Sequence, residues 1–297
     1  MLISQRVNTI LLVLILAAGI TIVAMLATEA RGGPLDPPGA PSSTLPLVEP
    51  RTPIRQPASA AGFPIAISAP GSYYLAENIT GVVGKAGIEI TASGVTLDLN
   101  GFTLTGAAGS ADGIATATVQ NLSIGHGTVR NWGSVGIYAD FAYDSTYEDL
   151  RLYGNIGEGV RASGNSLISH VVSTGNGGHG ILLNNAGFFG GIIRDSTAAR
   201  NALDGIQVLG RALVIENASF TNGGSQIHAI NTGNRIDSNN VAGQGALAIQ
   251  VDHGSNVIVR NSIQGAPSAV SIVGGNTVGP LETAATPLSN PWANILY

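Results

Sequence analysis

The segment GIQVLGRALVIEN, residues 205–217, contains two short apolar stretches, each followed by residues that favour a turn. In the first stretch, Ile206 and Val208 flank the polar Gln207. This alternation places the two apolar side chains on one side of a strand and the polar one on the other. The second stretch ends at Asn217, a residue type that favours bends. The segment therefore predicts two strands separated by a turn.

Both stretches recur in the same order along most of the chain. The first stretch, in which a small residue usually precedes a β-branched one, begins again every 21 to 26 residues. Its first apolar residues are Ile88, Ile114, Ile137, Val160, Ile181, Ile206, Ile227, Ile249 and Val270. Hydrogen-bonding residues follow in phase with it, at Asp98, Asn121, Asp149, His170, Asp195, Asn217, Asn239 and Asn261. A period of this length is typical of solenoids.

A stack of coils explains both series. Each unit bends a few times and returns about 4.8 Å above its starting point, so that hydrogen bonds run between units. One unit cannot bury its apolar face alone, and several must therefore stack. Leucine-rich repeats would show a Leu-x-x-Leu-x-Leu signature, and a β-propeller would need longer units. The repeats instead predict an all-β parallel β-helix of about eight to nine coils.

The polar residues at the bends have a structural explanation. Tight corners favour residues that tolerate a left-handed backbone, which accounts for the many Gly and Asn residues. Stacked Asn or Asp side chains also hydrogen-bond along their column and to the backbone of the bend. We therefore predict a structural ladder formed by Asn121, Asp149, Asp195, Asn217, Asn239 and Asn261.

The repeated Gly-Ile strand with Asn at the following bend resembles the repeats of the pectate-lyase-like superfamily. More narrowly, the chain is similar to exported β-helix proteins of planctomycete-type bacteria. The resemblance spans most of residues 45–297 and implies a right-handed helix. It leaves the activity open, because the superfamily contains lyases, hydrolases, epimerases and non-catalytic surface proteins. The segments that carry it are VEPRTPI (48–54), GSYYL (71–75), GVTLDLNGF (94–102) and NPWANI (290–295).

The N-terminal region predicts export. An apolar run from Ile10 to Ala27 follows Arg6, which fits either a signal peptide cleaved after Ala30 or an uncleaved membrane anchor. We expect a secreted, periplasmic or cell-surface protein that meets a membrane only through this segment. The predicted organisation is a signal peptide or anchor (1–30), a Pro-rich linker (31–62), an N-terminal cap (63–84), the β-helix (85–279) and a C-terminal cap (280–297).

Composition excludes several functions. Only 10% of residues are charged, the net charge is −5 and Lys85 is the single lysine, so a nucleic-acid partner is not expected. The chain has no cysteine, which excludes disulfides and thiolate metal sites. No metal ligand set and no cofactor are predicted. Calcium stays open, although the acidic residues lie on separate turns. The sequence does not predict the oligomeric state.

Candidate functional residues lie on the outward side of the Gly-Ile strands. Because these strands stack, their central polar residues form one column, and the residues just before the glycines form another. A uronate lyase needs a base, a cation that stabilises the enediolate, and an acid for the leaving oxygen. The candidate catalytic residues are Tyr138 (acid), Arg161 (cation or base), His179 and His228 (base). The candidate ligand-binding residues are Asp140, Tyr143, Glu158, Asp204 and Gln207.

Two functional hypotheses remain. In the first, a non-catalytic exported protein binds a polysaccharide or another cell-envelope component along one face. In the second, a lyase or hydrolase cleaves an acidic polysaccharide. The scattered acidic residues favour the first hypothesis, because pectate lyases cluster aspartates around calcium and polygalacturonase-type hydrolases need three closely placed aspartates.

Overall fold

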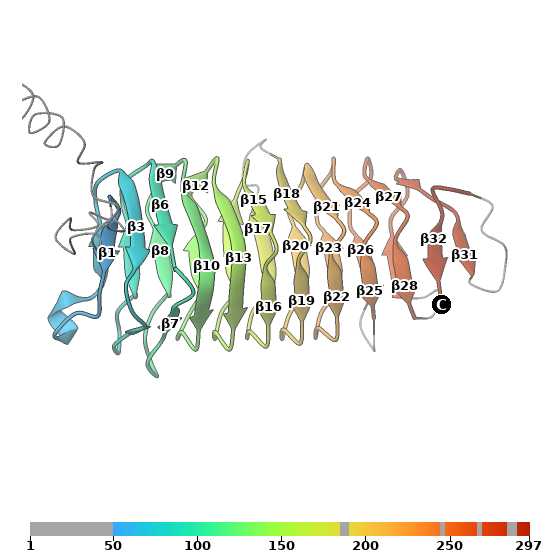
Figure 1. Ribbon diagram of the computed structural model, residues 1–297. Helices are drawn as coiled ribbons and strands as arrows, with labels where there is room; N and C mark the ends of the chain where they lie inside the picture. The colour runs from blue at the N-terminus through green and yellow to red at the C-terminus, as the bar shows by residue number, and fades with distance from the viewer. Residues whose placement is uncertain (1–49, 185–189, 244–246, 266–268, 284–289) are drawn as a thin grey trace, which may run out of the picture. The chain divides into compact units, whose positions relative to one another are not determined.

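A computed structural model describes residues 50–184, 190–243, 247–265, 269–283 and 290–297. The predicted signal or anchor segment and residues 31–49 of the predicted linker lie outside this part of the chain. Within it, no helix has the length and apolar character needed to cross a membrane. The strands of residues 50–297 stack along one axis (Figure 1), and all of their pairings are parallel. The predicted all-β parallel solenoid is therefore confirmed.

Each coil has three sides. The first side is a ten-stranded sheet, and the other two sides belong to a twenty-stranded sheet that bends at their shared corner. The ten-stranded sheet begins at Ile65, inside the segment predicted as the N-terminal cap, so the helix has more coils than the predicted eight to nine. Its strands are β2 (Ile65–Ile67), β5 (Ile88–Ile90), β8 (Ile114–Thr116), β11 (Ile137–Ala139), β14 (Val160–Ser163), β17 (Ile181–Asn184), β20 (Ile206–Val208), β23 (Ile227–Ala229), β26 (Ile249–Val251) and β29 (Val270–Ile272).

The second and third sides continue each coil. The second side contains β1 (Thr52–Ile54), β3 (Gly71–Leu75), β6 (Val95–Asp98), β15 (Leu167–Ser169), β18 (Gly191–Arg194), β21 (Ala212–Ile215), β24 (Arg235–Asp237), β27 (Val257–Val259) and β30 (Thr277–Val278). The third contains β4 (Ile79–Thr80), β7 (Thr103–Thr105), β16 (Val172–Thr174), β19 (Thr197–Ala199), β22 (Ala218–Phe220), β25 (Asn240–Ala242), β28 (Ser262–Gln264), β31 (Leu281–Thr283) and β32 (Asn294–Leu296). Strands β10 (Ser123–Arg130) and β13 (Thr146–Tyr153) run through both sides. A small sheet pairs β9 (Val119–Gln120) with β12 (Ala142–Tyr143), and a 3-10 turn, η1, spans Ala60–Gly62.

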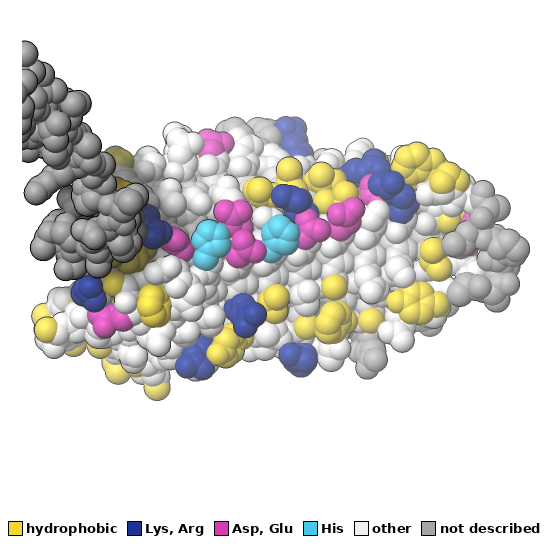
Figure 2. All heavy atoms as spheres, viewed as in Figure 1, with side chains coloured by type: hydrophobic (Ala, Val, Ile, Leu, Met, Phe, Trp, Pro, Cys, Tyr) yellow, Lys and Arg dark blue, Asp and Glu magenta, His cyan; other side chains and the backbone are white. Residues whose placement is uncertain are grey.

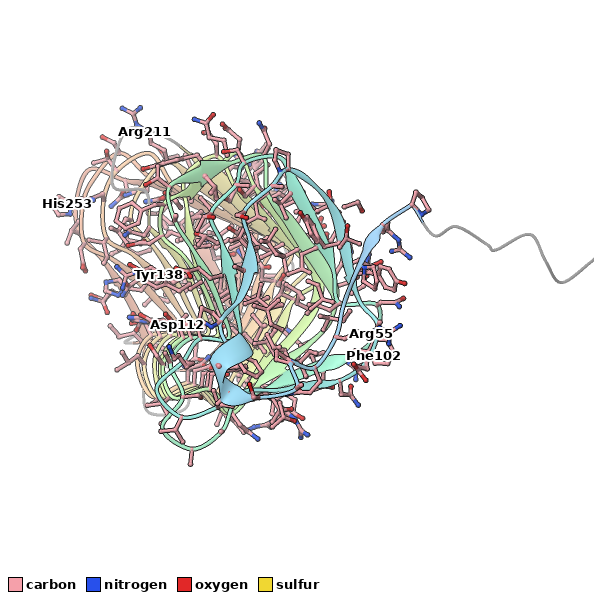
Figure 3. All side chains as sticks on the ribbon, turned by 90° about the vertical axis from the view of Figure 1, so that its left-hand side faces the viewer. Arg55, Phe102, Asp112, Tyr138, Arg211 and His253 are labelled. Atoms are coloured by element: carbon pink, nitrogen blue, oxygen red, sulfur yellow. The ribbon has the colours of Figure 1, made fainter. Side chains whose placement is uncertain are left out.

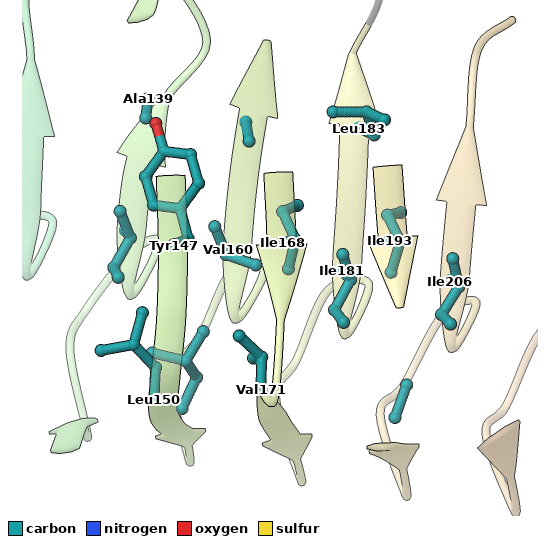
Figure 4. Close-up of a cluster of buried hydrophobic side chains, with 14 of the residues drawn as sticks. Ala139, Tyr147, Leu150, Val160, Ile168, Val171, Ile181, Leu183, Ile193 and Ile206 are labelled. Carbon is teal, nitrogen blue, oxygen red and sulfur yellow. The ribbon is translucent and has the colours of Figure 1, made fainter. Parts of the chain in front are cut away.

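The core consists of aliphatic columns. Ile88 pairs with Ile114, and Ile114 pairs with Ile137, so that equivalent side chains lie directly over one another. Ile181 continues the column, and all four side chains are fully buried. Figure 4 shows such side chains from successive coils packed between the three sides. Burying one Ile side chain contributes about 1.5–3 kcal/mol, so these columns are a main source of stability.

The glycine before each Ile is required for a different reason from the one expected. Left-handed corners were expected to account for the many glycines in general, but Gly87, Gly113 and Gly136 do not have a positive φ. Instead, a Cβ atom at each of them would lie closer than 3 Å to the carbonyl oxygen of the equivalent residue in the next coil. The Gly-Ile pattern thus reflects the close approach of stacked backbones at this corner.

Three of the predicted ladder residues form a buried ladder at the corner between the second and third sides. Nδ2 of Asn217 donates to Oδ1 of Asn239, and Nδ2 of Asn239 donates to Oδ1 of Asn261, each at 3.0 Å. The backbone N–H groups of Asn217 and Asn239 also donate to these oxygens. Asn294 extends the ladder beyond Asn261. Each asparagine therefore satisfies backbone and side-chain groups of its neighbours inside the coil.

The other three predicted ladder residues lie outside that column. Asp149 and Asp195 have φ values of 52° and 50° and occupy the left-handed corner position, one residue before the buried one. Their side chains are exposed at 55% and 31%, because the chain turns inward only at the next residue. Asn121, with φ 55°, lies at a different corner, before β10. Asp149 lies 3.7 Å from Nε2 of His126 and 3.9 Å from Nδ1 of His170. Acidic and histidine side chains form a row along the surface in Figure 2.

Two further asparagine ladders were not predicted. One joins Asn155, Asn176, Asn201 and Asn222 and ends at Gln226, whose Oε1 accepts from Nδ2 of Asn222 at 2.7 Å. Gln226 takes the place that Gly205 holds in the preceding coil and Ala248 in the following one. The other ladder joins Asn234, Asn256 and Asn276 at the corner that precedes the second side. In most cases the residue before the buried Asn has a positive φ, as at Gly154, Gly175 and Gly233.

Candidate functional site

The predicted outward column exists in the ten-stranded sheet. Tyr138 pairs with Arg161, Arg161 pairs with Leu182, and Leu182 pairs with Gln207, which pairs with His228. Viewed along the helix axis, Tyr138 and Asp112 lie on one side of the coil, opposite Arg55 and Phe102 (Figure 3). We call the outward surface of β11 to β26 the polar face. Its residues form two adjacent clusters.

The first cluster centres on Arg161. Its Nη2 lies 3.0 Å from Oδ2 of Asp140, and its Nη1 lies 3.9 Å from Oε1 of Glu158. The guanidinium carbon lies 5.8 Å from the centre of the Tyr138 ring. Asn184 holds the other oxygen of Asp140 at 2.6 Å. The hydrogen bond from Arg161 to Asp140 raises the pKa of Arg161, which is therefore a fixed cation.

The second cluster centres on Asp204. Its Oδ2 lies 3.0 Å from Nδ1 of His228 and accepts from Nε2 of Gln207 at 2.7 Å. Its Oδ1 accepts from the backbone N–H of Ser225 at 2.7 Å. On the other side of the His228 ring, Nε2 lies 2.9 Å from Oδ2 of Asp252. His228 thus bridges two carboxylates.

The two histidines have opposite protonation preferences. Burial lowers the pKa of His179, and nearby Asp204 offsets this only in part. The backbone N–H of Asp204 donates to Nδ1 of His179 at 3.1 Å, so the neutral ring carries its proton on Nε2. Burial also acts to lower the pKa of His228, but the hydrogen bonds with Asp204 and Asp252 outweigh it and the pKa is raised. The contacts of both ring nitrogens with carboxylates therefore favour the protonated form of His228.

The polar face is negatively charged. The carboxylates of Asp140, Glu158, Asp204 and Asp252 are opposed by the guanidinium of Arg161 and by the ring of His228. Even with His228 protonated, two carboxylates remain uncompensated. Among the described residues, no three His, Asp or Glu side chains are arranged to hold a metal ion. The face therefore offers hydrogen-bond acceptors and an aromatic ring to a ligand, but little positive charge.

The structure brings together eight of the nine predicted functional residues. Tyr138, Asp140, Glu158 and Arg161 form the first cluster, and His179, Asp204, Gln207 and His228 form the second. Tyr143 lies apart, on β12. Asn184 and Asp252 were missed. Both lie three residues after the first buried residue of their strand, like Asp140, and that position in the repeat could have identified them.

A pH-dependent contribution to stability follows from His228. Its raised pKa means that the imidazolium stabilises the fold fully below pH 6.5, and that this contribution disappears as the pH rises through the folded-state pKa. The pKa values of Asp204 and Asp252 are lowered, despite burial, so their contribution is present above pH 3.8 and disappears as the pH falls further. We expect His228→Gln to destabilise the protein most between about pH 4 and 6.5 and least above pH 8. Urea titrations of both proteins across this range measure the difference, and a difference that is constant with pH would contradict the assignment.

These stacked coils, with buried asparagine ladders and one polar face, define a parallel β-helix protein. A family model described as a right handed beta helix region matches residues 75–212, and the chain has the pectate-lyase-like right-handed β-helix fold. No match is found among curated protein sequences.

Solved structures share the fold at low sequence identity. The A-module of the mannuronan C-5 epimerase AlgE4 from Azotobacter vinelandii is 15% identical, with a TM-score of 0.54 over 82% of this chain and 84% of that chain. The AlgE6 A-module from the same organism is 16% identical, with a TM-score of 0.51 over 77% and 86%. Pectate lyase Pel9A is 14% identical, with a TM-score of 0.52 over 82% and 79%. This chain is thus related in fold to carbohydrate-active enzymes.

Proposed function

We propose that this chain binds a polysaccharide along the polar face without cleaving it, and that the bound sugars are neutral or carry ammonium groups. The uncompensated negative charge of the polar face is the observation that carries the proposal. A uronate polymer would bring further carboxylates to this surface, and like charges brought together are costly. Hydroxyl and ammonium groups would instead donate hydrogen bonds to it.

The repeat of the solenoid also supports a polymeric ligand. Outward residues of neighbouring coils lie about 4.8 Å apart, so an extended chain along the axis would meet equivalent positions on each coil. Tyr138 offers a ring with an apolar body and a hydroxyl group, a combination suited to a sugar. The structural neighbours include enzymes named for mannuronan and pectate, which agrees with a polysaccharide ligand in general.

Binding is favoured over cleavage because the predicted catalytic groups are occupied. Both nitrogens of His228 contact carboxylates, and Nδ1 of His179 accepts a backbone hydrogen bond. Arg161 is held by Asp140 and has a raised pKa, so it does not serve as a base. A general base needs a free lone pair within reach of the substrate proton. Nδ1 of His179 and both nitrogens of His228 are engaged, so none of these three atoms offers a free lone pair.

A polysaccharide lyase is the second candidate, and the contact between Tyr138 and Arg161 favours it. A cation beside a phenol is the pair that would stabilise an enediolate and protonate the leaving oxygen. Absorbance of unsaturated products, measured with alginate, pectate and other uronate polymers, decides between the two functions. Our proposal predicts no product with any of them. We further propose that the chain acts outside the cytoplasm, on the basis of the apolar run from Ile10 to Ala27.

Tyr138→Ala tests the binding surface. We expect glucosamine and glucose oligosaccharides to bind the wild-type chain in calorimetric titrations, and Tyr138→Ala to weaken this binding about tenfold, or by about 1.4 kcal/mol. The matched control is Tyr153→Ala. Arg130 lies 5.7 Å from the centre of the Tyr153 ring and donates to its hydroxyl, so this tyrosine also has an arginine partner, on another side of the coil. An equal effect of both variants, or uronate binding that depends on Tyr138, would rule out the proposal.

A further inference from the structure

The His228 ring lies between two carboxylates that belong to the coils on either side of it. Nδ1 lies 3.0 Å from Oδ2 of Asp204 in the preceding coil, and Nε2 lies 2.9 Å from Oδ2 of Asp252 in the following coil. A protonated imidazole has two N–H groups and donates to both carboxylates, whereas a neutral imidazole has one and donates to a single carboxylate. One proton therefore decides whether both contacts of the ring are hydrogen bonds.

The two carboxylates depend on this proton to different degrees. Asp204 has two further donors, because its Oδ2 accepts from Nε2 of Gln207 and its Oδ1 accepts from the backbone N–H of Ser225, each at 2.7 Å. Asp252 accepts on Oδ1 from Nε2 of Gln250 at 2.9 Å. The side chain of Asp252 is 39% exposed, against 11% for Asp204. Asp252 is thus the carboxylate of this pair that a ligand can reach.

Other titratable groups lie around this arrangement, on neighbouring coils. They are Glu158, Arg161, His179 and His253. Glu158 and Arg161 lie 3.9 Å apart and offset each other in charge. Burial lowers the pKa of His179, so this ring adds no fixed charge near neutral pH. His253 adjoins Asp252, and its Nδ1 lies 2.6 Å from the carbonyl oxygen of Ile230. The charge at His228 is consequently set mainly by the two carboxylates that its ring contacts.

We propose that an ammonium group on a bound sugar replaces the proton of His228, so that binding at Asp252 releases one proton to solvent. This inference rests on the proposed function, because it concerns the ammonium sugars assigned to the polar face. When the remaining proton of the ring is on Nδ1, toward Asp204, the lone pair of Nε2 and Oδ2 of Asp252 both become acceptors. An ammonium group has three donors and can bridge these two atoms.

The exchange keeps one positive charge at this point of the polar face. An ammonium group beside an imidazolium would instead place two like charges together, which disfavours the charged form of the ring. Burial acts to lower the pKa of His228, but the contacts with both carboxylates raise it above its ordinary value of 6.5 in the free protein. Linkage is reciprocal, so a proton that weakens ammonium binding is itself bound more weakly when the ammonium group is present. A neutral sugar has no such effect.

Nitrogen NMR of the labelled His228 ring tests this coupling, because the ring nitrogens report protonation and tautomer directly. We expect a saturating glucosamine trisaccharide to lower the apparent pKa of His228 by about one unit, which corresponds to a tenfold change in proton affinity. The N-acetylglucosamine trisaccharide, its neutral counterpart, should bind and leave this pKa unchanged. His228→Gln identifies the signals of the ring.

Asp252→Asn tests the partner of the ammonium group. We expect this variant to bind the glucosamine trisaccharide about tenfold more weakly, or by about 1.4 kcal/mol, and to lose the effect of the sugar on His228. Asp149→Asn is the matched control, since Asp149 is also exposed and lies 3.7 Å from His126 and 3.9 Å from His170 at another corner. Thermal melts establish that each variant is folded, and the titration of the wild-type chain decides the proposal even if Asp252→Asn is unstable.

Two results would overturn this inference. The first is an unchanged pKa of His228 at saturation with the glucosamine trisaccharide, and the second is an equal shift with the N-acetylated sugar. In both cases the bound sugars would leave the proposed function in place. The absence of binding by either trisaccharide would remove the proposed function together with the inference.

Discussion

Asn239→Ala is expected to lower the free energy of unfolding by about 3 kcal/mol, because it removes the central member of a buried ladder. The backbone N–H of Asn217 would lose its acceptor, Oδ1 of Asn239, and the carbonyl of Val214 would lose its donor, Nδ2 of Asn239. Both groups lie inside the coil, where water does not replace the lost partner. An unsatisfied buried polar group costs about 1–3 kcal/mol.

Asn240→Ala is the matched control for this prediction. Asn240 follows directly in the chain, but it is exposed and its side chain accepts one hydrogen bond, from the hydroxyl of Tyr297. An exposed substitution of this kind changes stability by less than about 0.5 kcal/mol. Urea denaturation followed by circular dichroism measures both variants. Equal stabilities of Asn239→Ala and Asn240→Ala would show that the ladder contributes little.

The repeat pattern was sufficient to predict the fold and most members of the polar face, although not Asn184 and Asp252. Ile88, Ile114 and Ile137 lie at matching positions of successive repeats, and stacking alone requires them to pair. The same reasoning placed Tyr138 beside Arg161, since both occupy the central outward position of their strands. Period-two alternation and the regular interval between repeats are therefore enough to predict these pairings.

The contacts within the polar face could not be predicted in the same way. Asp140 and Asn184 are joined across two coils, because the small Ser163 lies between them in the column. The bridging of Asp204 and Asp252 by His228 likewise depends on side-chain direction and not on spacing. Such contacts decide which groups are free for chemistry, and for that reason the sequence left binding and catalysis unresolved.

The asparagine ladders correspond to a pattern in the sequence that the prediction of single corners did not use. The dipeptide Gly-Asn occurs five times, and at residues 154–155, 175–176, 233–234 and 275–276 the glycine has a positive φ while the asparagine joins a ladder. The exception is Gly164-Asn165, where the asparagine itself has the positive φ and its side chain is exposed. Asp149 and Asp195 have the same backbone conformation, but they occupy the glycine position of this pair. A polar residue at a left-handed corner is thus a poor indicator of burial, whereas Asn directly after one is a good indicator.

Trp132→Ala is expected to destabilise the protein by about 3–5 kcal/mol, the usual cost of removing a buried Trp side chain. The indole is fully buried, and its Nε1 donates to the carbonyl of Leu104 at 3.2 Å. The coil two turns earlier carries Gly81 and Gly87 against the ring, and a Cβ atom at either would lie closer than 3 Å to it. These glycines cannot close around the cavity, so the structure would relax little after the substitution.

The substitution of Trp132 should also affect the unfolding of coils other than its own. A solenoid is held together by contacts between neighbours, so a cavity between the early and central coils weakens the coupling of the two parts. We therefore expect a broader unfolding transition in Trp132→Ala than in the wild type. Trp292→Ala is the matched control, because this indole is half exposed, and we expect it to cost less than about 1 kcal/mol. If the two variants unfolded at the same denaturant concentration and with the same steepness, the close fit of glycines around Trp132 would not be a source of stability.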